Sequence, residues 1–240
     1  MQYSTFAAID IGSYDVILEI FEISKKQGIR SVDKICHRME LGKDTYTLGK
    51  IRPEMEEELC RVLADFVRIM EGYRVDDYRA TASSAISEAS NSLYVLGKIH
   101  QLTGLSVTVL SNSEQRFLSY KALAAMEDNF NKIIEKGTAI LDLDGGSFQI
   151  SLFDKDALVT TQNIRMGSLR IRERLAGIQS ETEHYEEMVE ELIWNEVSSF
   201  KKMYLKDRKI ENIMLIGDVF TDSVYPVSYT HLTLPTKLEV

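Results

Sequence analysis

Ile140-Leu141-Asp142-Leu143-Asp144-Gly145-Gly146-Ser147 repeats the pattern of an earlier stretch, Phe6-Ala7-Ala8-Ile9-Asp10-Ile11-Gly12-Ser13. In each stretch an apolar run typical of a buried strand contains a late aspartate, and a turn with glycine and serine follows. A second strand is predicted after each turn, at Val16–Ile23 and at Phe148–Phe153. This internal repeat predicts a duplicated α/β fold with a cleft between its halves.

The segments around these hairpins alternate between predicted helices and strands. The pattern predicts helices over Pro53–Tyr73, Ser87–Thr103, Ser113–Met126 (with Ser113 as N-cap), Ser168–Leu175 and Glu183–Tyr204. It predicts further strands over Ser31–Leu41, Asp77–Ala82, Ser106–Leu110, Ala157–Ile164 and Ile213–Ile216. We therefore expect a first lobe over residues 1–126 and a second lobe over residues 136–225.

The last residues have a different character. The run Pro226–Thr236 resembles the translation of a transposon-end sequencing adaptor, and it follows a half-finished domain. We expect residues 226–240 to be a non-native tail, with the natural reading frame interrupted near Tyr225. The second lobe is then expected to be truncated.

Composition limits the classes of partner. The chain has 240 residues, of which 44% are apolar, and its net charge is −9. A negative chain is a poor binder of nucleic acid or of an anionic membrane. Its two cysteines, Cys36 and Cys60, form neither a disulfide framework nor a metal-binding motif. The start does not resemble a signal peptide, and no apolar run approaches the ~20 residues of a membrane span. We therefore expect a cytoplasmic protein.

The two turns have the residue types of a phosphate site. Glycine permits close backbone approach, successive N–H groups can converge on an anion, and serine adds a hydroxyl donor. An aspartate at a strand end can hold a divalent cation beside the phosphate. The candidate phosphate ligands are Gly12, Ser13, Gly145, Gly146 and Ser147, and the candidate metal ligands are Asp10, Asp142 and Asp144. The same aspartates could instead be ordinary turn residues.

Five segments resemble the exopolyphosphatase/guanosine pentaphosphate phosphatase (Ppx/GppA) family, in matching order over residues 6–220. They are the two turns, Thr81–Asn91, Val109–Gln115 and Arg165–Arg170. The resemblance implies an actin-like, two-lobed fold (the ASKHA class, ribonuclease H-like) with the site in the cleft. It also implies Mg²⁺-dependent hydrolysis of phosphoanhydrides in polyphosphate or guanosine pentaphosphate.

Several positions depart from the family pattern. The two carboxylates that the family uses to activate water fall on Gln115 and Gln149, and an amide cannot act as a general base. The family's phosphate-clamping arginine falls on Ser87, and the first glycine of the second turn is Asp144. In the first turn, Tyr14-Asp15 replaces the family's Asn-Ser.

Two residues have open roles. Glu114 is the remaining candidate base, and it could equally be an acid in the first turn of a helix. Arg170 is a candidate phosphate ligand, and it could also belong to an exposed charged face.

Three functions follow from the resemblance and its departures. The first is an exopolyphosphatase or guanosine pentaphosphate phosphatase. The second is a catalytically impaired regulatory module that binds a phosphorylated ligand, such as guanosine tetraphosphate, without turning it over. The third is an actin-like ATPase or sugar kinase. We expect no nucleic-acid or membrane partner, and homodimerisation stays open.

Overall fold

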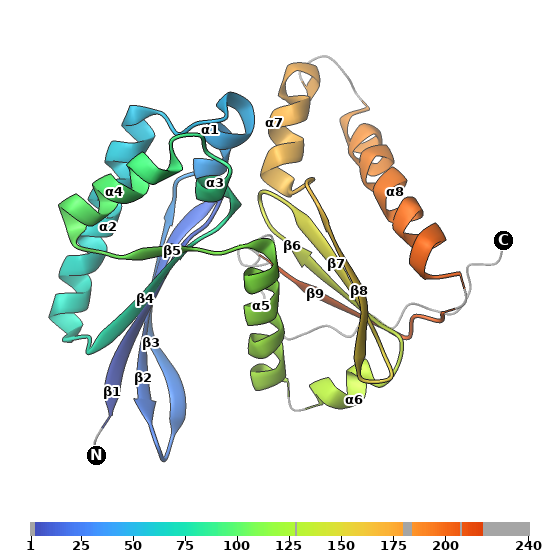
Figure 1. The fold of residues 1–240 in the computed structure, drawn as a ribbon, viewed down its shortest axis with the longest axis horizontal. Coiled ribbons are helices and arrows are strands. Elements are labelled where there is room, and N and C mark those ends of the chain that lie inside the picture. The colour runs from blue at the N-terminus through green and yellow to red at the C-terminus, as the bar shows by residue number, and fades with distance from the viewer. Residues whose placement is uncertain (1–2, 128, 180–183, 207, 218–240) are drawn as a thin grey trace. The chain divides into compact units, whose positions relative to one another are not determined.

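The computed structural model describes residues 3–217, apart from 128, 180–183 and 207 (Figure 1). The predicted tail at residues 226–240 lies outside the described residues. The chain divides into two compact units, Met1–Gln115 and Arg116–Val240.

The first unit contains a five-stranded sheet in the order β3-β2-β1-β4-β5. Strands β1, β2 and β3 form an antiparallel meander, whereas β4 pairs parallel with β1 and β5 pairs parallel with β4. The strands are β1 (Ser4–Ile11), β2 (Asp15–Ser24), β3 (Gly28–Arg38), β4 (Asp77–Ala82) and β5 (Val107–Val109). The helices are α1 (Leu41–Leu48), α2 (Pro53–Tyr73), α3 (Ser84–Ser87) and α4 (Ser92–Thr103).

The second unit repeats this strand order as β8-β7-β6-β9. Its first three strands are antiparallel, and β9 pairs parallel with β6. The strands are β6 (Thr138–Leu143), β7 (Phe148–Asp154), β8 (Ala157–Ile164) and β9 (Asn212–Ile216). The helices are α5 (Asn112–Met126, which begins in the first unit), α6 (Phe130–Ile134), α7 (Ser168–Gln179) and α8 (Tyr185–Tyr204). In both units the third, second, first and fourth strands lie side by side, so the predicted duplication is confirmed.

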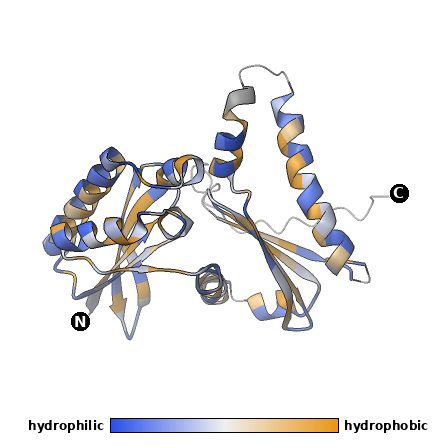
Figure 2. Cartoon of the chain, turned by 45° about the horizontal axis from the view of Figure 1, so that its top comes forward, coloured by the Kyte–Doolittle hydropathy of each residue, from blue (hydrophilic) through white to orange (hydrophobic). Residues whose placement is uncertain are grey.

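Each unit has its own apolar core. In the first unit, alternate residues of β1 and β2 pack with α2, and the group includes Ala7, Ile9, Val16, Leu18, Leu59, Leu63 and Phe66. The sheet of the second unit is apolar on both faces, because α5 and α6 cover one face and α8 covers the other. Hydrophobic and hydrophilic residues alternate along α8 (Figure 2), as expected for a helix with one apolar side.

The residues that the structure describes cover the apolar side of α8 incompletely. An apolar groove of about 1170 Å³ runs between α8, α7 and the sheet, with Leu141, Phe148 and Ile193 in its wall. The second unit therefore keeps solvent-accessible apolar surface on this face. Trp194 on α8 does not line this groove and is 62% exposed.

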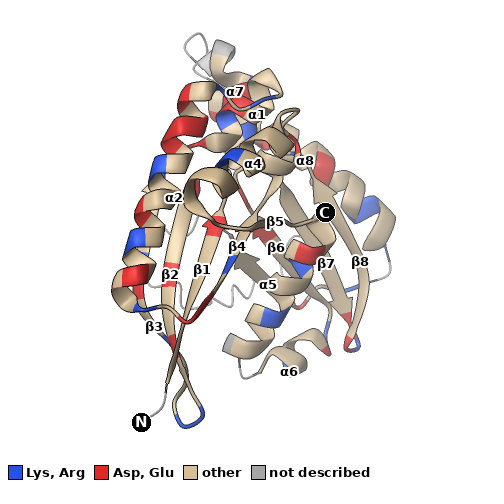
Figure 3. Ribbon diagram, turned by 60° about the vertical axis from the view of Figure 1, so that its left-hand side comes forward, with Lys and Arg blue, Asp and Glu red and all other residues tan. Residues whose placement is uncertain are grey.

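Charged residues lie along the helices. Lys and Arg alternate with Asp and Glu along α2 (Figure 3), which is the pattern of a helix with a solvated face. Within the described ranges, none of the helices has both the length and the apolar character needed to cross a bilayer.

The sequence predicted most elements and missed three short helices. Helix α2 and strands β4 and β8 have the predicted bounds. The predicted Ser87–Thr103 helix is wrong at its start, because α4 begins only at Ser92. The short helices α1, α3 and α6 were not predicted. Helix α1 has eight residues between two left-handed positions, Glu40 (φ 53°) and Gly49 (φ 70°), and so gives little periodic signal.

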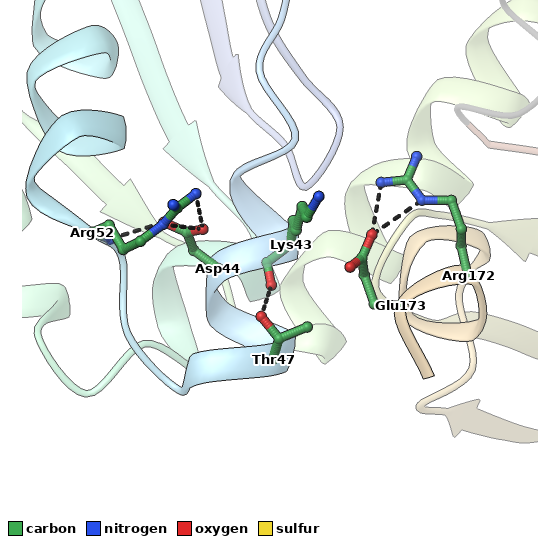
Figure 4. Close-up of polar contacts among 6 residues, drawn as sticks. All are labelled: Lys43, Asp44, Thr47, Arg52, Arg172 and Glu173. Atoms are coloured by element: carbon green, nitrogen blue, oxygen red, sulfur yellow. Dashed lines mark hydrogen bonds and ion pairs between the residues drawn. The ribbon is translucent and has the colours of Figure 1, made fainter. Parts of the chain in front are cut away.

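An ion pair between a buried carboxylate and a half-exposed arginine holds α1 in place. Asp44 is 1% exposed, and its carboxylate accepts bonds from the Arg52 backbone N–H at 2.9 Å and from Arg52 Nε at 2.9 and 3.0 Å (Figure 4). The Arg52 Nη2 atom lies 2.9 Å from Asp44 Oδ1. This bond to Asp44 raises the pKa of Arg52. The pair therefore ties α1 to the N-terminus of α2.

Candidate functional site

In the first turn, hydrogen bonds engage the carbonyl oxygens of Ser13 and Tyr14, while the Ser13 N–H stays available as a donor. The Gly12 N–H donates to the Asp15 carbonyl at 2.9 Å and closes the turn. The carbonyl oxygens of Ser13 and Tyr14 accept 2.9 Å bonds from backbone N–H groups of residues 39–42. The Ser13 N–H donates to no atom in the described part of the chain. Such an amide at a tight turn is the kind of donor that binds an anion.

The second turn is built in the same way. The Asp144 N–H donates to the Ser147 carbonyl at 3.0 Å, at the position equivalent to Gly12. The carbonyl oxygens of Asp144 and Gly145 accept bonds of 3.0–3.2 Å from backbone N–H groups of residues 168–170 at the start of α7. Over the residues that the structure describes, the N–H groups of Gly145 and Gly146 find no acceptor.

Arg170 contacts this second turn directly. Its Nε atom donates to the Gly146 carbonyl at 2.8 Å. The side chain therefore fixes the turn to α7, and a contact between Arg170 and phosphate stays a prediction. Most carbonyl groups of the two turns are engaged, so the N–H groups without an acceptor among the described residues are the parts that can receive a ligand.

Gly167 lets α7 approach the second turn. A Cβ atom at this position would lie 2.4 Å from the backbone of Asp144 and Gly145. We expect Gly167→Ala to lower the free energy of unfolding by roughly 1–3 kcal/mol, because backbone has to move to relieve the overlap. The control is Gly72→Ala in α2, where a Cβ meets nothing within 4 Å. That change should stabilise by about 0.5–1 kcal/mol. Urea unfolding measures both, and equal effects would contradict the close approach.

Asp10 is the last residue but one of β1, beside the first turn. Its carboxylate accepts a 3.4 Å bond from Thr81 Oγ1 on β4. The pKa of Asp10 is raised to about 6, because surrounding protein atoms displace water from the carboxylate and the Thr81 bond only partly opposes this. The residue is nevertheless exposed, since water still reaches one side of a group that has protein on its other sides.

The raised pKa of Asp10 predicts a pH effect on stability. The folded protein keeps the Asp10 proton up to about pH 6, whereas the unfolded chain releases it near the ordinary aspartate pKa of 3.8. The stability contribution is therefore present below pH 3.8 and is lost as pH rises through 6. We expect Asp10→Asn to unfold at higher urea concentration than the native chain at about pH 8, with the difference shrinking toward about pH 4. A difference that stays constant over this range would contradict the shift.

Asp142 occupies the equivalent place in the second unit, and it is buried. It is 8% exposed and accepts a 3.3 Å bond from Ser119 Oγ on α5. Burial raises the pKa of Asp142, and the Ser119 bond opposes this. Gln149 lies directly opposite Asp142 on β7 and is 2% exposed. The Gln149 Oε1 atom is buried with no hydrogen-bond partner among the described residues.

These oxygens fit a divalent cation. An orphaned amide oxygen beside a buried carboxylate is an acceptor that a cation would satisfy, and Mg²⁺ commonly uses one or two carboxylates with water and phosphate. Asp144 is half-buried two residues away. Among the residues with a described placement, no three His, Cys, Asp or Glu side chains gather into one cluster. A cation here would therefore depend on amide, water or phosphate oxygens as well.

Glu114 belongs to a helix cap. Its Oε2 atom accepts bonds from the Ser111 N–H at 2.9 Å and from Ser111 Oγ at 2.7 Å, and the Glu114 N–H donates to Ser111 Oγ at 3.3 Å. The N-cap of α5 is thus Ser111, and the prediction of Ser113 was wrong. The backbone and side-chain bonds from Ser111 lower the pKa of Glu114. This arrangement is a capping box, whose Ser-x-x-Glu spacing is readable in the sequence.

Two further positions complete the comparison with the prediction. Gln115 is half-buried on α5, next to the capping residue. Ser87, at the position of the expected arginine, is exposed at the end of α3. Sequence reasoning missed Tyr46 of α1, whose hydroxyl lies 2.6 Å from Ser13 Oγ and 2.8 Å from Ser84 Oγ. No local motif signals this contact, because Tyr46 and Ser13 are far apart in the chain.

Curated relatives are longer than this chain. It is 22% identical over 247 residues to a bifunctional 3-dehydroquinate synthase/phosphatase of Fusobacterium nucleatum, covering 98% of this chain and 34% of the relative. It is 25% identical over 144 residues to exopolyphosphatase 1 of Mycobacterium leprae, covering 60% of this chain and 41% of the relative. The chain thus spans about a third to two fifths of these relatives.

Solved structures share the fold. The Aquifex aeolicus member of the Ppx/GppA protein family is 23% identical, with a TM-score of 0.68, over 94% of this chain and 72% of that one. An exopolyphosphatase from Cytophaga hutchinsonii is 20% identical, with a TM-score of 0.71, over 89% of this chain and 66% of that one. The predicted α/β fold of the actin-like class is confirmed.

The family profile covers most of the chain. The sequence profile described as the Ppx/GppA phosphatase family matches residues 19–233. Together with the two glycine-containing turns and the duplicated strand order, this match shows that the chain belongs to the Ppx/GppA phosphatase family.

Proposed function

We propose that this chain binds the phosphoanhydride groups of polyphosphate or of guanosine tetra- or pentaphosphate, and hydrolyses them slowly or not at all. The observation that carries the proposal is the set of backbone N–H groups at Ser13, Gly145 and Gly146, which have no acceptor within the described ranges. Buried or half-buried N–H groups of this kind are normally paired, and an anionic oxygen is a strong acceptor for them. Ser13 and Ser147 would add hydroxyl donors.

The impaired chemistry follows from the side chains around these turns. Hydrolysis needs a base that takes a proton from the attacking water, and such a base contributes roughly 10²–10⁴-fold in rate. The two positions where the family pattern has carboxylates are Gln115 and Gln149, which cannot accept that proton. Glu114 has a lowered pKa and accepts two bonds in a helix cap, so it is poorly placed to replace them.

Mg²⁺ is the cation we propose for this family member. Asp142 and the free oxygen of Gln149 would hold it in the second unit, and Asp144 and Asp10 are further candidate ligands. The ion would supply positive charge that neutralises phosphate oxygens. A negative chain that binds a polyanion needs such local positive charge.

Hydrolysis in this chain is the second candidate function, and one observation favours it. The pKa of the buried Asp142 carboxyl is raised, which brings it closer to the pH at which a general base works well. In this alternative Asp142 takes the proton that the glutamines cannot. An actin-like ATPase or sugar kinase is the third alternative, because the fold is common to these activities.

Binding and turnover can be measured on the same samples. Calorimetric titration with pyrophosphate, polyphosphate, guanosine tetraphosphate and ATP in Mg²⁺ tests binding, and phosphate release tests turnover. We expect binding of a phosphoanhydride without release above background. Binding should add about 2.7 kcal/mol of stability when the ligand is at a hundred times its Kd. Release at rates of ordinary enzymes would favour the second candidate, a preference for ATP would favour the third, and no binding would refute the proposal.

A further inference from the structure

A row of three hydroxyl groups connects the first turn to two helices of the same unit. Ser13 Oγ lies 2.6 Å from Tyr46 Oη, which lies 2.8 Å from Ser84 Oγ. Ser13 follows β1, Tyr46 is in α1, and Ser84 begins α3. Ser13 is only 3% exposed, whereas Tyr46 and Ser84 are half-buried. The row therefore leads from the interior toward the surface.

The number of protons in this row gives it a direction. Three hydroxyl groups carry three protons, and the two short bonds at Tyr46 use two of them. Ser13 Oγ and Ser84 Oγ are 3.5 Å apart, which is the longest of the three contacts. Either hydroxyl of each pair can be the donor, and in the arrangement that satisfies the buried Ser13 through Tyr46, Tyr46 donates to Ser84 and the Ser84 proton is left for a ligand. Hydrogen bonds in a chain polarise one another, so the outer hydroxyl becomes a better donor to an anion.

The backbone N–H of Ser13, beside the row, also needs a hydrogen-bond acceptor. The Ser13 N–H has no acceptor in the described part of the chain. The carbonyl oxygens of Ser13 and Tyr14 are already engaged by residues 39–42, which lead directly into α1. Those bonds hold α1 against the turn and so hold Tyr46 in place.

We propose that Tyr46 is a positioning residue for a phosphoryl oxygen, acting by orienting the Ser84 hydroxyl toward a ligand at the first turn. The inference rests on the proposed phosphoanhydride binding and adds a residue to it. A tyrosine can do this because its rigid ring carries a hydroxyl that both accepts and donates. Tyr46→Phe removes that hydroxyl and keeps the ring.

The test is a calorimetric titration of inorganic pyrophosphate, with Mg²⁺, into the chain and its variants. We expect Tyr46→Phe to weaken binding roughly tenfold, as for the loss of one hydrogen bond in a charged network. The matched control is Tyr73→Phe, which removes a hydroxyl that donates to Asp33 Oδ2 at 2.8 Å elsewhere in the unit. Its affinity should equal that of the unmodified chain. Circular dichroism confirms that each variant is folded.

A double-mutant cycle with Ser84→Ala separates positioning from a direct contact. If Tyr46 acts through Ser84, the double variant should bind about as weakly as Ser84→Ala alone. Additive losses would overturn the positioning role. If the unmodified chain binds pyrophosphate and Tyr46→Phe behaves like Tyr73→Phe, this inference fails and the proposed function stands. If the unmodified chain does not bind, both fail.

Discussion

Replacing Gln115 and Gln149 with glutamate should raise phosphate release from polyphosphate or guanosine pentaphosphate by roughly 10²–10⁴-fold in the presence of Mg²⁺. The change adds one ionisable oxygen at each position where the family pattern has a carboxylate, with almost no change in side-chain shape. Gln149 faces Asp142 across β6 and β7, so its replacement also adds negative charge for a cation. A malachite green assay of released phosphate measures the effect.

The matched control makes the same substitution at a residue outside both turns, on a helix of the first unit. Gln101 is exposed on α4, so Gln101→Glu adds the same charge at a solvated site. It should leave the rate at background. Single variants show whether the two positions act together, because residues that work as one unit are strongly non-additive. If the folded double variant releases phosphate no faster than Gln101→Glu, the two glutamines do not explain impaired hydrolysis.

The largest expected effect on stability comes from Asp44. Asp44→Ala removes the buried acceptor of the Arg52 backbone N–H and guanidinium. We expect the free energy of unfolding to fall by roughly 1.5–3 kcal/mol, the range for a hydrogen bond to a charged group, since the buried carboxylate is lost while the half-exposed Arg52 side chain can turn to water. Urea unfolding followed by circular dichroism measures the change. Loss of the pair should also loosen α1 and with it Tyr46.

An exposed ion pair in α2 gives the comparison for Asp44. The side chains of Asp65 and Arg68 contact each other, and they are 58% and 74% exposed. Asp65→Ala should cost less than about 1 kcal/mol, because water replaces the lost contact. A similar loss for Asp44→Ala and Asp65→Ala would show that burial of Asp44 does not strengthen its pair.

The sequence predicts this fold well wherever local pattern and tertiary structure agree. The two hairpins were predictable because in each of them a turn with glycine and serine separates two apolar runs. Helix α2 was predictable because it has an apolar stripe at helical spacing and begins with Pro53. Helix α1 was not predictable in this way. It depends on Arg52 and on the bond from Thr45 Oγ1 to the Ala85 carbonyl, 2.6 Å long and 40 residues apart in sequence.

In the candidate site too, residues with a local sequence signal were predictable and residues placed by tertiary packing were not. The turn residues Gly12, Ser13, Gly145 and Gly146 could be chosen from sequence because their chemistry is local. Tyr46 could not, since only the packing of α1 brings it to Ser13. The role of Glu114 was readable in principle, because a serine three residues before a glutamate at a helix start predicts a capping box.

Trp194 determines how these stability measurements should be made. It is the only tryptophan of the chain, and it lies on the exposed side of α8 in the second unit. Tryptophan emission therefore does not report on α1, Asp44 or Tyr46 in the first unit, and it changes little even when the second unit unfolds, because the indole is already largely exposed. A fluorescent dye that binds exposed apolar surface would also bind the apolar groove beside α8 in the folded protein, which raises the fluorescence before unfolding begins. Far-UV circular dichroism, which follows the helices and strands of both units, is the suitable probe.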